Sequence, residues 1–487
     1  MEERKGFGTN FGFLMAAVGS AVGLGNIWGF PNKMGASGGF TFLVIYLILA
    51  VLCGFIVMVG ELAIGRKTGK GAVEAYHVLS KKFKWMGWMG ILSAFFILFF
   101  YCALGGYCIK YTVTNIGDLF GASFGSGAAA ELAAANGSSV GAEVFGAFIG
   151  NPTEAIIYGL IFVAITMIIV IGGIGGGIEK VCSVGMPALF VMLLICIVRA
   201  CTLEGAVNGL RYMFVPGWAV TNGVIEKAPD FLTVLATAGG QMFFSLSLGM
   251  GAMITYGSYL NKKENLQKNA ILIIVMDTLV ALMAGLCVIP GRFALDPTGA
   301  LGGPKLLFIT MQNVFSRMGG LGPIFGILFY LLVVFAAVSS SISLLEVIVA
   351  HFVDKARDAG KGDKRKPYTL IAAAAVGVGC ILVCADALGT TGFAPGNLLG
   401  MTGDLPTWAA DWLDFWDMLS EGIMMPLGAL LMSLMIGWEI GPEMVKDECE
   451  QSGHAMSGYG FFKICVKFIT PLCMILILYG QIKEFFF

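Results

Sequence analysis

The sequence predicts an all-α membrane protein that crosses the bilayer many times. Hydrophobic residues make up 57% of the 487-residue chain, only 13% of it is charged, and the mean hydropathy is +0.85. Soluble proteins are far less apolar than this. Several stretches exceed the roughly 20 apolar residues that a helix needs to span a bilayer. Two of these stretches are interrupted by small and polar residues, which predicts broken helices.

We expect eleven spanning helices, each an apolar run between polar connections. They lie near residues 10–34, 39–64, 86–114, 154–173, 178–199, 232–259, 267–290, 322–353, 368–386, 416–437 and 460–482. The first run is too long for a cleaved signal sequence and leads straight into the second. We therefore predict that it is retained in the mature protein.

Charge in the connections alternates along the chain. Lysine and arginine crowd the N-terminus and the connections at 65–84, 260–268 and 354–366, which are alternate connections. The connection at 116–152 carries only acidic charges and is rich in Gly, Ala and Ser. Because basic residues accumulate on the cytoplasmic side, we expect a cytoplasmic N-terminus and, with eleven spans, an external C-terminus. The expected location is the cell (inner or plasma) membrane.

The first and sixth predicted spans are the interrupted ones. The first carries Gly-Ser-Ala-Val-Gly-Leu-Gly-Asn at residues 19–26, and the sixth carries Ser-Leu-Ser-Leu-Gly-Met-Gly at 245–251. Lipid offers no hydrogen-bond partners, so irregular backbone at this depth persists only where protein buries it or where it lines a cavity. Paired breaks in corresponding places indicate the binding site of a transporter. The alternative is two glycine-rich helices that simply pack closely.

The ends of a broken helix have opposite polarity. A helix that resumes at Leu24 presents free N–H groups and a positive dipole end, which suit a carboxylate. A helix that ends near Val22 presents free carbonyls, which suit an ammonium group or a metal cation. The second break offers the same two ends and two hydroxyls. Opposed half-helices therefore suit a zwitterion accompanied by small cations.

Three of the acidic side chains within the predicted spans, and a run of serines, are candidates for the site. Asp277 lies deep in the seventh span, where an acid is costly and is a functional candidate by default. Its carboxylate is a ligand for a hard cation, although a protonated, hydrogen-bonded acid is the alternative. Glu61 lies near the basic end of the second span, so structural pairing is the competing explanation, and Glu346 is ambiguous. The serines at 339–341 either bond back to helix carbonyls or complete an oxygen shell for sodium.

The sequence contains no motif typical of an enzyme or of a nucleic-acid-binding protein. The twelve cysteines scatter mostly within spans and the three histidines are dispersed. The chain carries no P-loop, nucleophile elbow, HExxH motif or dinucleotide fingerprint followed by a strand. We therefore expect neither an enzyme nor a nucleic-acid-binding protein.

Taken together, these runs resemble the neurotransmitter:sodium symporter family over essentially the whole chain. The resemblance is carried by GSAVGLGNIW at 19–28 with Phe-Pro at 30–31, Gly-Gly-Phe at 38–40 before Tyr46, Glu61 with Gly-Arg at 65–66, GQMFFSLSLG at 240–249 and ITYGSY at 254–259. It implies a single transporter domain over residues 1–487. That domain would contain inverted five-helix repeats at about 10–199 and 232–437, and an extra helix at about 460–482.

The resemblance implies two sodium sites beside the breaks. The first ion would be held by the carbonyls of Ala21 and Ser245, the side chains of Asn26, Ser245 and Asp277, and the carboxylate of the substrate. The second ion would be held by the carbonyls of Gly19, Val22 and Ala336 and the hydroxyls of Ser339 and Ser340.

The same resemblance implies a site for the substrate. Its carboxylate would meet the amides of Leu24 and Gly25 and the hydroxyl of Tyr101. Its ammonium group would meet the carbonyls of Ala21 and Phe244 and the side chain of Ser247. Its side chain would occupy a largely apolar pocket formed by Ile97, Phe244, Met250, Ser340 and Leu344.

Two departures from the relatives' pattern refine the expected substrate and ions. Monoamine-carrying relatives have an aspartate where this chain has Gly23, so the substrate must bring its own carboxylate. Chloride-dependent relatives have an asparagine at the position of Asp277 and a serine at that of Ala281. The carboxylate of Asp277 can supply the negative charge that chloride otherwise provides, so we expect no chloride requirement. Asp277 is also a candidate to take up a proton when the site empties.

Gates are expected on both sides of the site. On the inside, Arg4 and Asp354 match the family's latch and Phe7 its aromatic neighbour, while Gly177 and Pro187 have the spacing of the segment that unwinds to release the inner sodium. On the outside, Asp414 matches the acidic gate residue, but Gly29 replaces its basic partner. We expect either Lys33 or an aromatic lid formed by Phe244 and Tyr101 to close the outer side in place of that ion pair.

We therefore expect a symporter that uses sodium to import a neutral, hydrophobic amino acid by alternating access. A proton-coupled or exchange-type carrier of the same fold is one alternative. A non-transporting amino-acid sensor is another, although the basic 354–366 connection contains no recognisable output domain.

Overall fold

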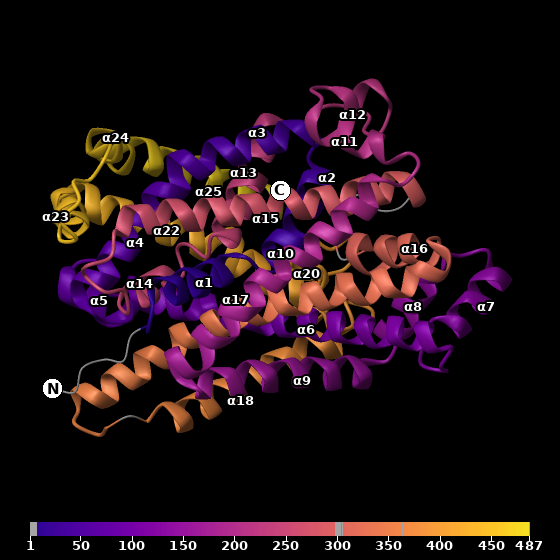
Figure 1. The fold of residues 1–487 in the computed structure, drawn as a ribbon, viewed down its shortest axis with the longest axis horizontal. Helices are drawn as coiled ribbons and strands as arrows, with labels where there is room; N and C mark the ends of the chain where they lie inside the picture. Colours follow the sequence, from indigo (N-terminus) through magenta and orange to yellow (C-terminus); the bar gives the residue numbers. More distant parts are fainter. Residues whose placement is uncertain (1–6, 298–302, 304, 363, 487) are drawn as a thin grey trace.

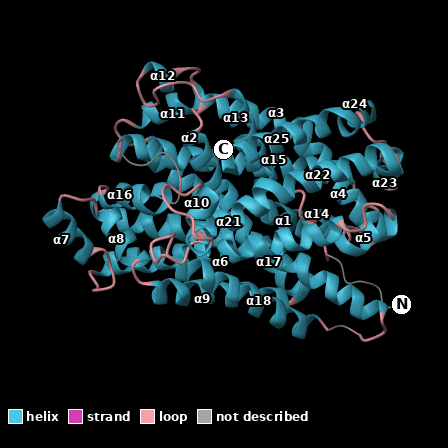
Figure 2. Ribbon diagram, turned by 180° about the vertical axis from the view of Figure 1, so that it is seen from behind, coloured by secondary structure: helices cyan, strands magenta, loops and turns pink. Residues whose placement is uncertain are grey.

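The computed structural model describes residues 7–297, 303, 305–362 and 364–486, and it is a bundle of helices (Figures 1 and 2). Within those ranges no strand is formed. Nine of the described helices are long and apolar enough to cross a membrane, or ten if one bent pair counts as a single span. The prediction of an all-α, multi-span membrane protein is confirmed, while the number eleven stays a prediction.

The nine long helices coincide with nine of the predicted spans. Their bounds are Phe40–Thr68 (α3, η2, α4), Met86–Phe120 (α6), Pro152–Ile171 (α9), Ile174–Cys201 (η3, α10), Leu266–Leu295 (α15), Gly319–Asp358 (η5, α17), Arg365–Asp386 (α18), Trp412–Ile440 (α21, η6, α22, η7) and Tyr459–Phe486 (α24, η8, α25). The η segments are short turns of 3-10 or π-helix within or beside these spans.

The first predicted span is broken where its small residues lie. Helix α1 (Asn10–Ala21) ends when Val22 turns to extended backbone with ψ of 102°. A second helix, η1 (Gly25–Gly29) with α2 (Phe30–Ala36), then continues at an angle of 45° to the first. The new helix begins with the amides of Asn26 and Ile27 donating to the carbonyl of Gly23, each at 3.2 Å.

The sixth predicted span is broken at its predicted place as well. Helix α13 (Phe231–Ser245) and helix α14 (Ala252–Gly257) are separated by residues 246–251. The backbone there has φ of +54° at Ser247, +80° at Gly249 and +77° at Gly251. Position 249 requires glycine because a Cβ atom there would lie 2.2 Å from the carbonyl oxygen of Met425.

Shorter helices occupy the connections. They are α5 (Ala72–Leu79), α7 (Gly127–Asn136), α8 (Val140–Ile149), α11 (Ala206–Phe214), α12 (Trp218–Thr221), η4 with α16 (Leu306–Ser316), α19 (Pro395–Leu398), α20 (Thr407–Ala410) and α23 (Glu443–Glu450). The connection at 116–152 therefore contains two helices that its composition did not lead us to predict. Alanine, the strongest helix former, fills much of α7, and Ser139 caps α8 by accepting from the amide of Ala142.

The long helices run between two ends of the bundle. Figure 1 shows α5, α14, α23 and α24 at one end, and α7, α8, α11, α12 and α16 at the other. The connection between α17 and α18 lies at the same end as α5. The predicted cytoplasmic connections thus gather at one end. Helices α6 and α17 form the largest helix–helix interface and cross the centre beside both breaks.

Candidate functional site

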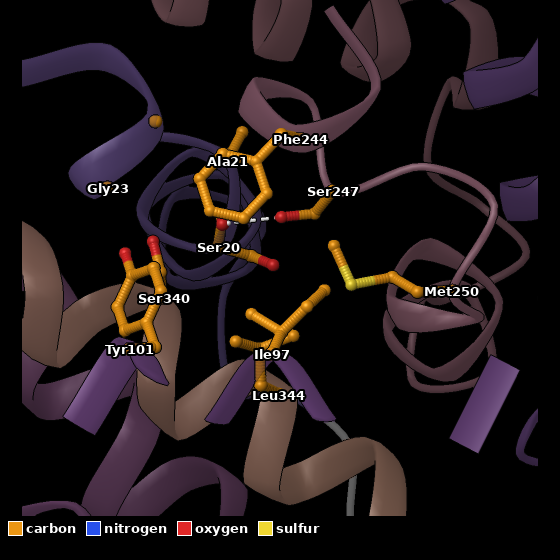
Figure 3. Close-up of a pocket in the computed structure, with 11 residues that line it drawn as sticks. Ser20, Ala21, Gly23, Ile97, Tyr101, Phe244, Ser247, Met250, Ser340 and Leu344 are labelled. Carbon is orange, nitrogen blue, oxygen red and sulfur yellow. Dashed lines mark hydrogen bonds between the residues drawn. The ribbon is translucent and has the colours of Figure 1, made fainter. Parts of the chain in front are cut away.

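The two helix breaks line one small pocket together with α6 and α17 (Figure 3). Its volume is only about 10 Å³, so the lining side chains nearly fill it in this structure. The lining residues come from the first break (Ser20, Ala21, Gly23 and Gly25), the second break (Phe244, Ser247 and Met250), α6 (Ile97 and Tyr101) and α17 (Ser340 and Leu344). All but Ser20 are among the predicted substrate contacts.

The pocket has a polar end and an apolar end. The hydroxyl groups of Tyr101 and Ser340 lie beside Gly23, whereas Ile97, Met250 and Leu344 lie away from it (Figure 3). The ring of Phe244 is 6.3 Å from that of Tyr101, measured between centroids. A molecule with a charged end and a hydrocarbon side chain matches this division.

Hydroxyl and amide side chains bond the backbone groups freed by the breaks. The amide of Leu24 donates to the hydroxyl oxygen of Tyr101 at 2.8 Å. The hydroxyl of Ser247 donates to the carbonyl of Ser20 at 2.7 Å (Figure 3). The side-chain amide of Gln241 donates to the carbonyl of Gly25 at 2.7 Å. These bonds link the two breaks to each other and to α6, so the irregular backbone is not left unpaired.

The wall of the pocket at Gly23 leaves no room for a side chain. A Cβ atom at this position would lie 2.2 Å from the hydroxyl oxygen of Ser340 and 2.3 Å from that of Tyr101. Only hydrogen fits at this position without a shift of the two hydroxyls. Any negative charge that binds at this end must therefore come from the ligand.

Asp277 of α15 lies beside the first break, and its side chain is fully buried. The side-chain amide of Asn26 donates to it at 2.7 Å, and the hydroxyl of Ser245 lies 3.0 Å from both carboxylate oxygens. The hydroxyl of Tyr46 donates at 3.4 Å. In the described part of the chain, no lysine or arginine pairs with this carboxylate. The three side chains predicted at the first sodium site are thus in direct contact, and Ala21 lines the adjoining pocket.

A second cluster of oxygen atoms joins α1 to α17. The hydroxyl of Ser339 donates to the carbonyls of Ala336 at 2.9 Å and Val22 at 3.3 Å. The hydroxyl of Ser340 donates to the carbonyls of Gly19 at 3.2 Å and Val22 at 3.3 Å. The five residues predicted for the second sodium therefore lie together. Oxygen-only sites such as this one suit hard cations.

On the side predicted to face outward, Lys33 of α2 forms an ion pair with Glu421 of η6. This acid was not predicted, and it lies seven residues beyond the predicted gate residue Asp414. The amide of Asp414 instead donates to the carboxylate of Asp411 at 2.7 Å. Burial, with a contribution from the neighbouring Asp386 carboxylate, raises the pKa of Asp411 to about 6.

Gly29 occupies the position where relatives carry the basic gate residue. A Cβ atom at this position would lie 2.8 Å from the side-chain oxygen of Gln241.

For the predicted inner gate, Arg4 lies outside the described residues, so its contact with Asp354 stays a prediction. The carboxylate of Asp354 is buried, accepts from the amide of Gly71 at 3.1 Å and lies 3.8 Å from the guanidinium of Arg357. The ring of Phe7 packs edge-on against Phe13, Tyr256 and Tyr259 at centroid distances of 5.5, 5.8 and 6.1 Å.

Glu61 and Glu346, the other two acidic candidates from the sequence, have definite partners. Glu61 accepts from the amide of Gly249 at 2.7 Å and so holds the second break, rather than pairing with a basic loop. Glu346 accepts from Arg365 at 2.5 and 3.0 Å and from the hydroxyl of Tyr259 at 2.8 Å. Both acids therefore stabilise the structure around the site.

Glu179 was missed by the sequence analysis. Its carboxylate accepts from the amide of Gly8 at 2.9 Å and from the hydroxyl of Thr9 at 3.2 Å, directly before α1. A negative charge is favourable at the N-terminus of a helix. The available signal was an acid within the Gly177–Pro187 segment, but the sequence did not reveal its partner in α1.

Comparisons with known proteins agree with this architecture. A family model described as "Sodium:neurotransmitter symporter family" matches residues 4–120 and 147–486. An uncharacterised sodium-dependent transporter of Bacillus subtilis, YhdH, is 32% identical over 481 residues, with 96% of each chain covered. One from Haemophilus influenzae is 29% identical, with 98% of each chain covered. The crystal structure of MhsT in complex with L-phenylalanine matches with a TM-score of 0.82 and 32% identity, covering 98% of this chain and 100% of that one.

Proposed function

The chain belongs to the sodium:neurotransmitter symporter family and is a sodium-coupled membrane transporter, and we propose that it imports a neutral, hydrophobic amino acid by alternating access. The observation that carries the proposal is the pocket between the two breaks, which is polar beside Gly23 and apolar at Ile97, Met250 and Leu344. Crystals of the structural relative MhsT contain L-phenylalanine, which supports a substrate of this class.

In this proposal the zwitterion replaces bonds that the protein now makes internally. The carboxylate of the substrate takes the amides of Leu24 and Gly25 and the hydroxyl of Tyr101. The ammonium group takes the carbonyls of Ala21 and Phe244 and the hydroxyl of Ser247. Burying a charged group is tolerable only when it is fully paired, so a solute that lacks either charge should bind poorly.

Two sodium ions would accompany the substrate. Asn26, Ser245, Asp277 and the substrate carboxylate would hold the first ion, and the Ser339–Ser340 cluster would hold the second. Since Asp277 supplies a fixed negative charge at the first site, we propose that chloride is not required. Proton uptake by Asp277 when the site empties would then carry positive charge outward on the return step.

Alternating access needs contacts that can break on each side. We propose the Lys33–Glu421 ion pair as the outer contact, with Phe244 and Tyr101 below it, and the region around Asp354 and Phe7 as the inner contact. The chain would form one transporter domain of two inverted repeats and an extra helix. Its N-terminus would lie in the cytoplasm and its C-terminus outside, because the basic connections gather at one end of the bundle.

Sodium coupling supplies enough free energy for accumulation. A zwitterion has no net charge, so the membrane potential alone cannot concentrate it. Each sodium ion contributes about 2.3 kcal/mol per 100 mV. Two ions give roughly 4.6 kcal/mol before any concentration gradient, and a thousandfold accumulation needs about 4.1 kcal/mol. A proton returned outward on Asp277 would cancel part of this electrical contribution, and the sodium concentration gradient would then have to supply the difference.

Uptake into proteoliposomes tests the proposal. Radiolabelled amino acids are offered as a panel while sodium, chloride and pH are varied independently. We expect sodium-driven accumulation of large apolar amino acids that continues when gluconate replaces chloride. Accumulation driven by a proton gradient without sodium would favour the proton-coupled alternative. Collapse in gluconate would contradict chloride independence alone.

A further inference from the structure

A second and larger cavity lies on the outside of the bundle, between α6, α17 and α18. Its volume is about 390 Å³. Apart from the polar tips of Trp88 and Tyr368, its walls are hydrocarbon and include Leu92, Ile348 and Ile371. Trp88, Leu92 and Ile371 are 45%, 43% and 67% exposed, so the groove is open along its outer side. Since these helices span the membrane, that side faces lipid.

The groove lies at the predicted cytoplasmic end of the three helices. Trp88 is in the first turn of α6, Phe352 is near the end of α17, and Tyr368 is in the first turn of α18. Tryptophan and tyrosine favour the level of the lipid headgroups, where one part of the ring is apolar and the other is wet. Trp88 and Tyr368 therefore mark the headgroup end of the groove.

Contacts behind the lining residues hold the walls in place. The ring of Trp88 packs edge-on against the imidazole of His351 at 4.7 Å, and that imidazole lies 2.8 Å from the carboxylate of Glu74. The ring of Phe352 lies 5.8 Å from that of Tyr368. A preformed groove loses little conformational entropy when it is filled, which favours binding of one defined molecule.

The rim at the headgroup end carries uncompensated positive charge. Lys84 lies two residues before the start of α6, and Lys364 is the N-cap of α18, so each lysine lies just outside the helix that carries a lining aromatic residue. Both side chains are exposed, as is Lys366. Among the residues that the structure describes, none of these three lysines forms an ion pair.

The neighbouring acids that the structure describes are in contact with other groups. Glu346 bonds Arg365, Asp358 pairs with Lys70 at 2.6 Å, and Glu74 contacts His351. They are not free to neutralise Lys84 and Lys364. The rim therefore presents cations to any ligand that approaches along the headgroup layer.

We propose that this groove binds an anionic phospholipid, with an acyl chain along the groove and the headgroup phosphate beside Lys84 and Lys364. The acyl chain passes from lipid hydrocarbon to the hydrocarbon walls of the groove, so its packing there does not distinguish one headgroup from another. The lysines add the preference for negative charge, since basic pockets between helices on the cytoplasmic side bind anionic headgroups. The inference does not depend on which solute the central pocket carries.

Native mass spectrometry of the full-length, detergent-purified protein tests the proposal. The protein is titrated with phosphatidylglycerol or with phosphatidylcholine of identical acyl chains. We expect wild type to retain phosphatidylglycerol preferentially. Lys84→Gln and Lys364→Gln should each weaken that retention about fivefold, the effect of one basic residue near an anionic surface. The matched control, Lys262→Gln with Lys263→Gln, removes two charges from another connection and should change nothing.

A groove-filling variant separates the acyl chain from the headgroup. Ala375→Phe places a ring in the groove and should lower retention of both lipids equally, while sodium-dependent amino-acid binding shows that the fold is intact. If Ala375→Phe does not fold, the lysine variants still test the preference of the groove for an anionic headgroup. Equal retention of the two lipids by wild type would overturn the proposal. Wild-type retention by the double variant Lys84→Gln/Lys364→Gln would do the same.

Discussion

The side-chain amide of Asn26 in η1 donates to the carboxylate of Asp277 in α15 at 2.7 Å. This bond joins the first helix break to a fully buried acid. The other side-chain donors to Asp277 are the neutral hydroxyls of Ser245 and Tyr46. Neutral donors offset only part of the cost of burying a charge. An ionised Asp277 therefore calls for a bound cation, and this requirement is the physical basis of the first sodium site.

Removing the negative charge of Asp277 should make transport depend on chloride. Asp277→Asn keeps an oxygen ligand but removes the negative charge, so uptake by this variant should be severely reduced. The double variant Asp277→Asn/Ala281→Ser supplies the side chains that chloride-dependent relatives carry, and we expect uptake that now depends on chloride. The measurement is amino-acid uptake in chloride and in gluconate. A double variant that is equally active in both would refute the role assigned to this charge.

Ser339→Ala and Ser340→Ala should each weaken sodium binding. Each change removes a hydroxyl that contacts the carbonyl of Val22 in the second cluster. We expect the sodium concentration for half-maximal uptake to rise about tenfold or more, as for the loss of a charge-assisted contact. Ser341→Ala is the matched control, because that hydroxyl faces Thr166 at 2.8 Å, outside the cluster. Equal effects at all three serines would indicate a packing role instead.

Gly23→Ala should close the polar end of the pocket. The added methyl group would lie 2.2 Å from the hydroxyl oxygen of Ser340, so either the hydroxyls or the helix end must shift. We expect substrate affinity to fall at least about tenfold, within the usual 1–3 kcal/mol cost of overpacking. The comparison is Gly185→Ala in α10, where the nearest atom would lie at an ordinary 3.8 Å. Unchanged affinity in a folded Gly23→Ala protein would place the substrate elsewhere.

The Lys33–Glu421 pair should behave as a buried contact that closes the outer side. Lys33→Gln alone leaves the acid of a largely buried pair without its partner, so thermal stability should fall and bound substrate should dissociate faster. The double variant Lys33→Gln/Glu421→Gln should recover stability but keep the faster dissociation. Lys110→Gln, which breaks the α6–α9 pair with Glu154, controls for general loss of an ion pair. Substrate dissociation at the wild-type rate in every variant would exclude a gating role.

The helix breaks could be predicted because their cause is local. Glycine and serine at 19–26 and 245–251 weaken a helix wherever they occur, and the membrane makes such a weakness costly unless it has a use. Both breaks appear at the predicted residues. Asp277 was predictable for a similar reason, since a single acid within an apolar span is unusual on its own.

Two of the contacts that the sequence did not reveal join residues far apart in the chain. Lys33 and Glu421 are separated by 388 residues, and Glu179 and Gly8 by 171. A local sequence pattern does not indicate which of the 31 acidic side chains pairs with a given donor. The helices at 127–136 and 140–149 are not evident from composition, because glycine and serine favour loops in the same connection where alanine favours helix.

Sodium-titrated binding of radiolabelled leucine and phenylalanine to the purified protein is the most direct measurement of a shared sodium and substrate site. We expect saturable binding in sodium, none when potassium replaces sodium, and none in Asp277→Ala protein whose folding has been verified. Equal binding in potassium, or full binding by folded Asp277→Ala, would contradict the account.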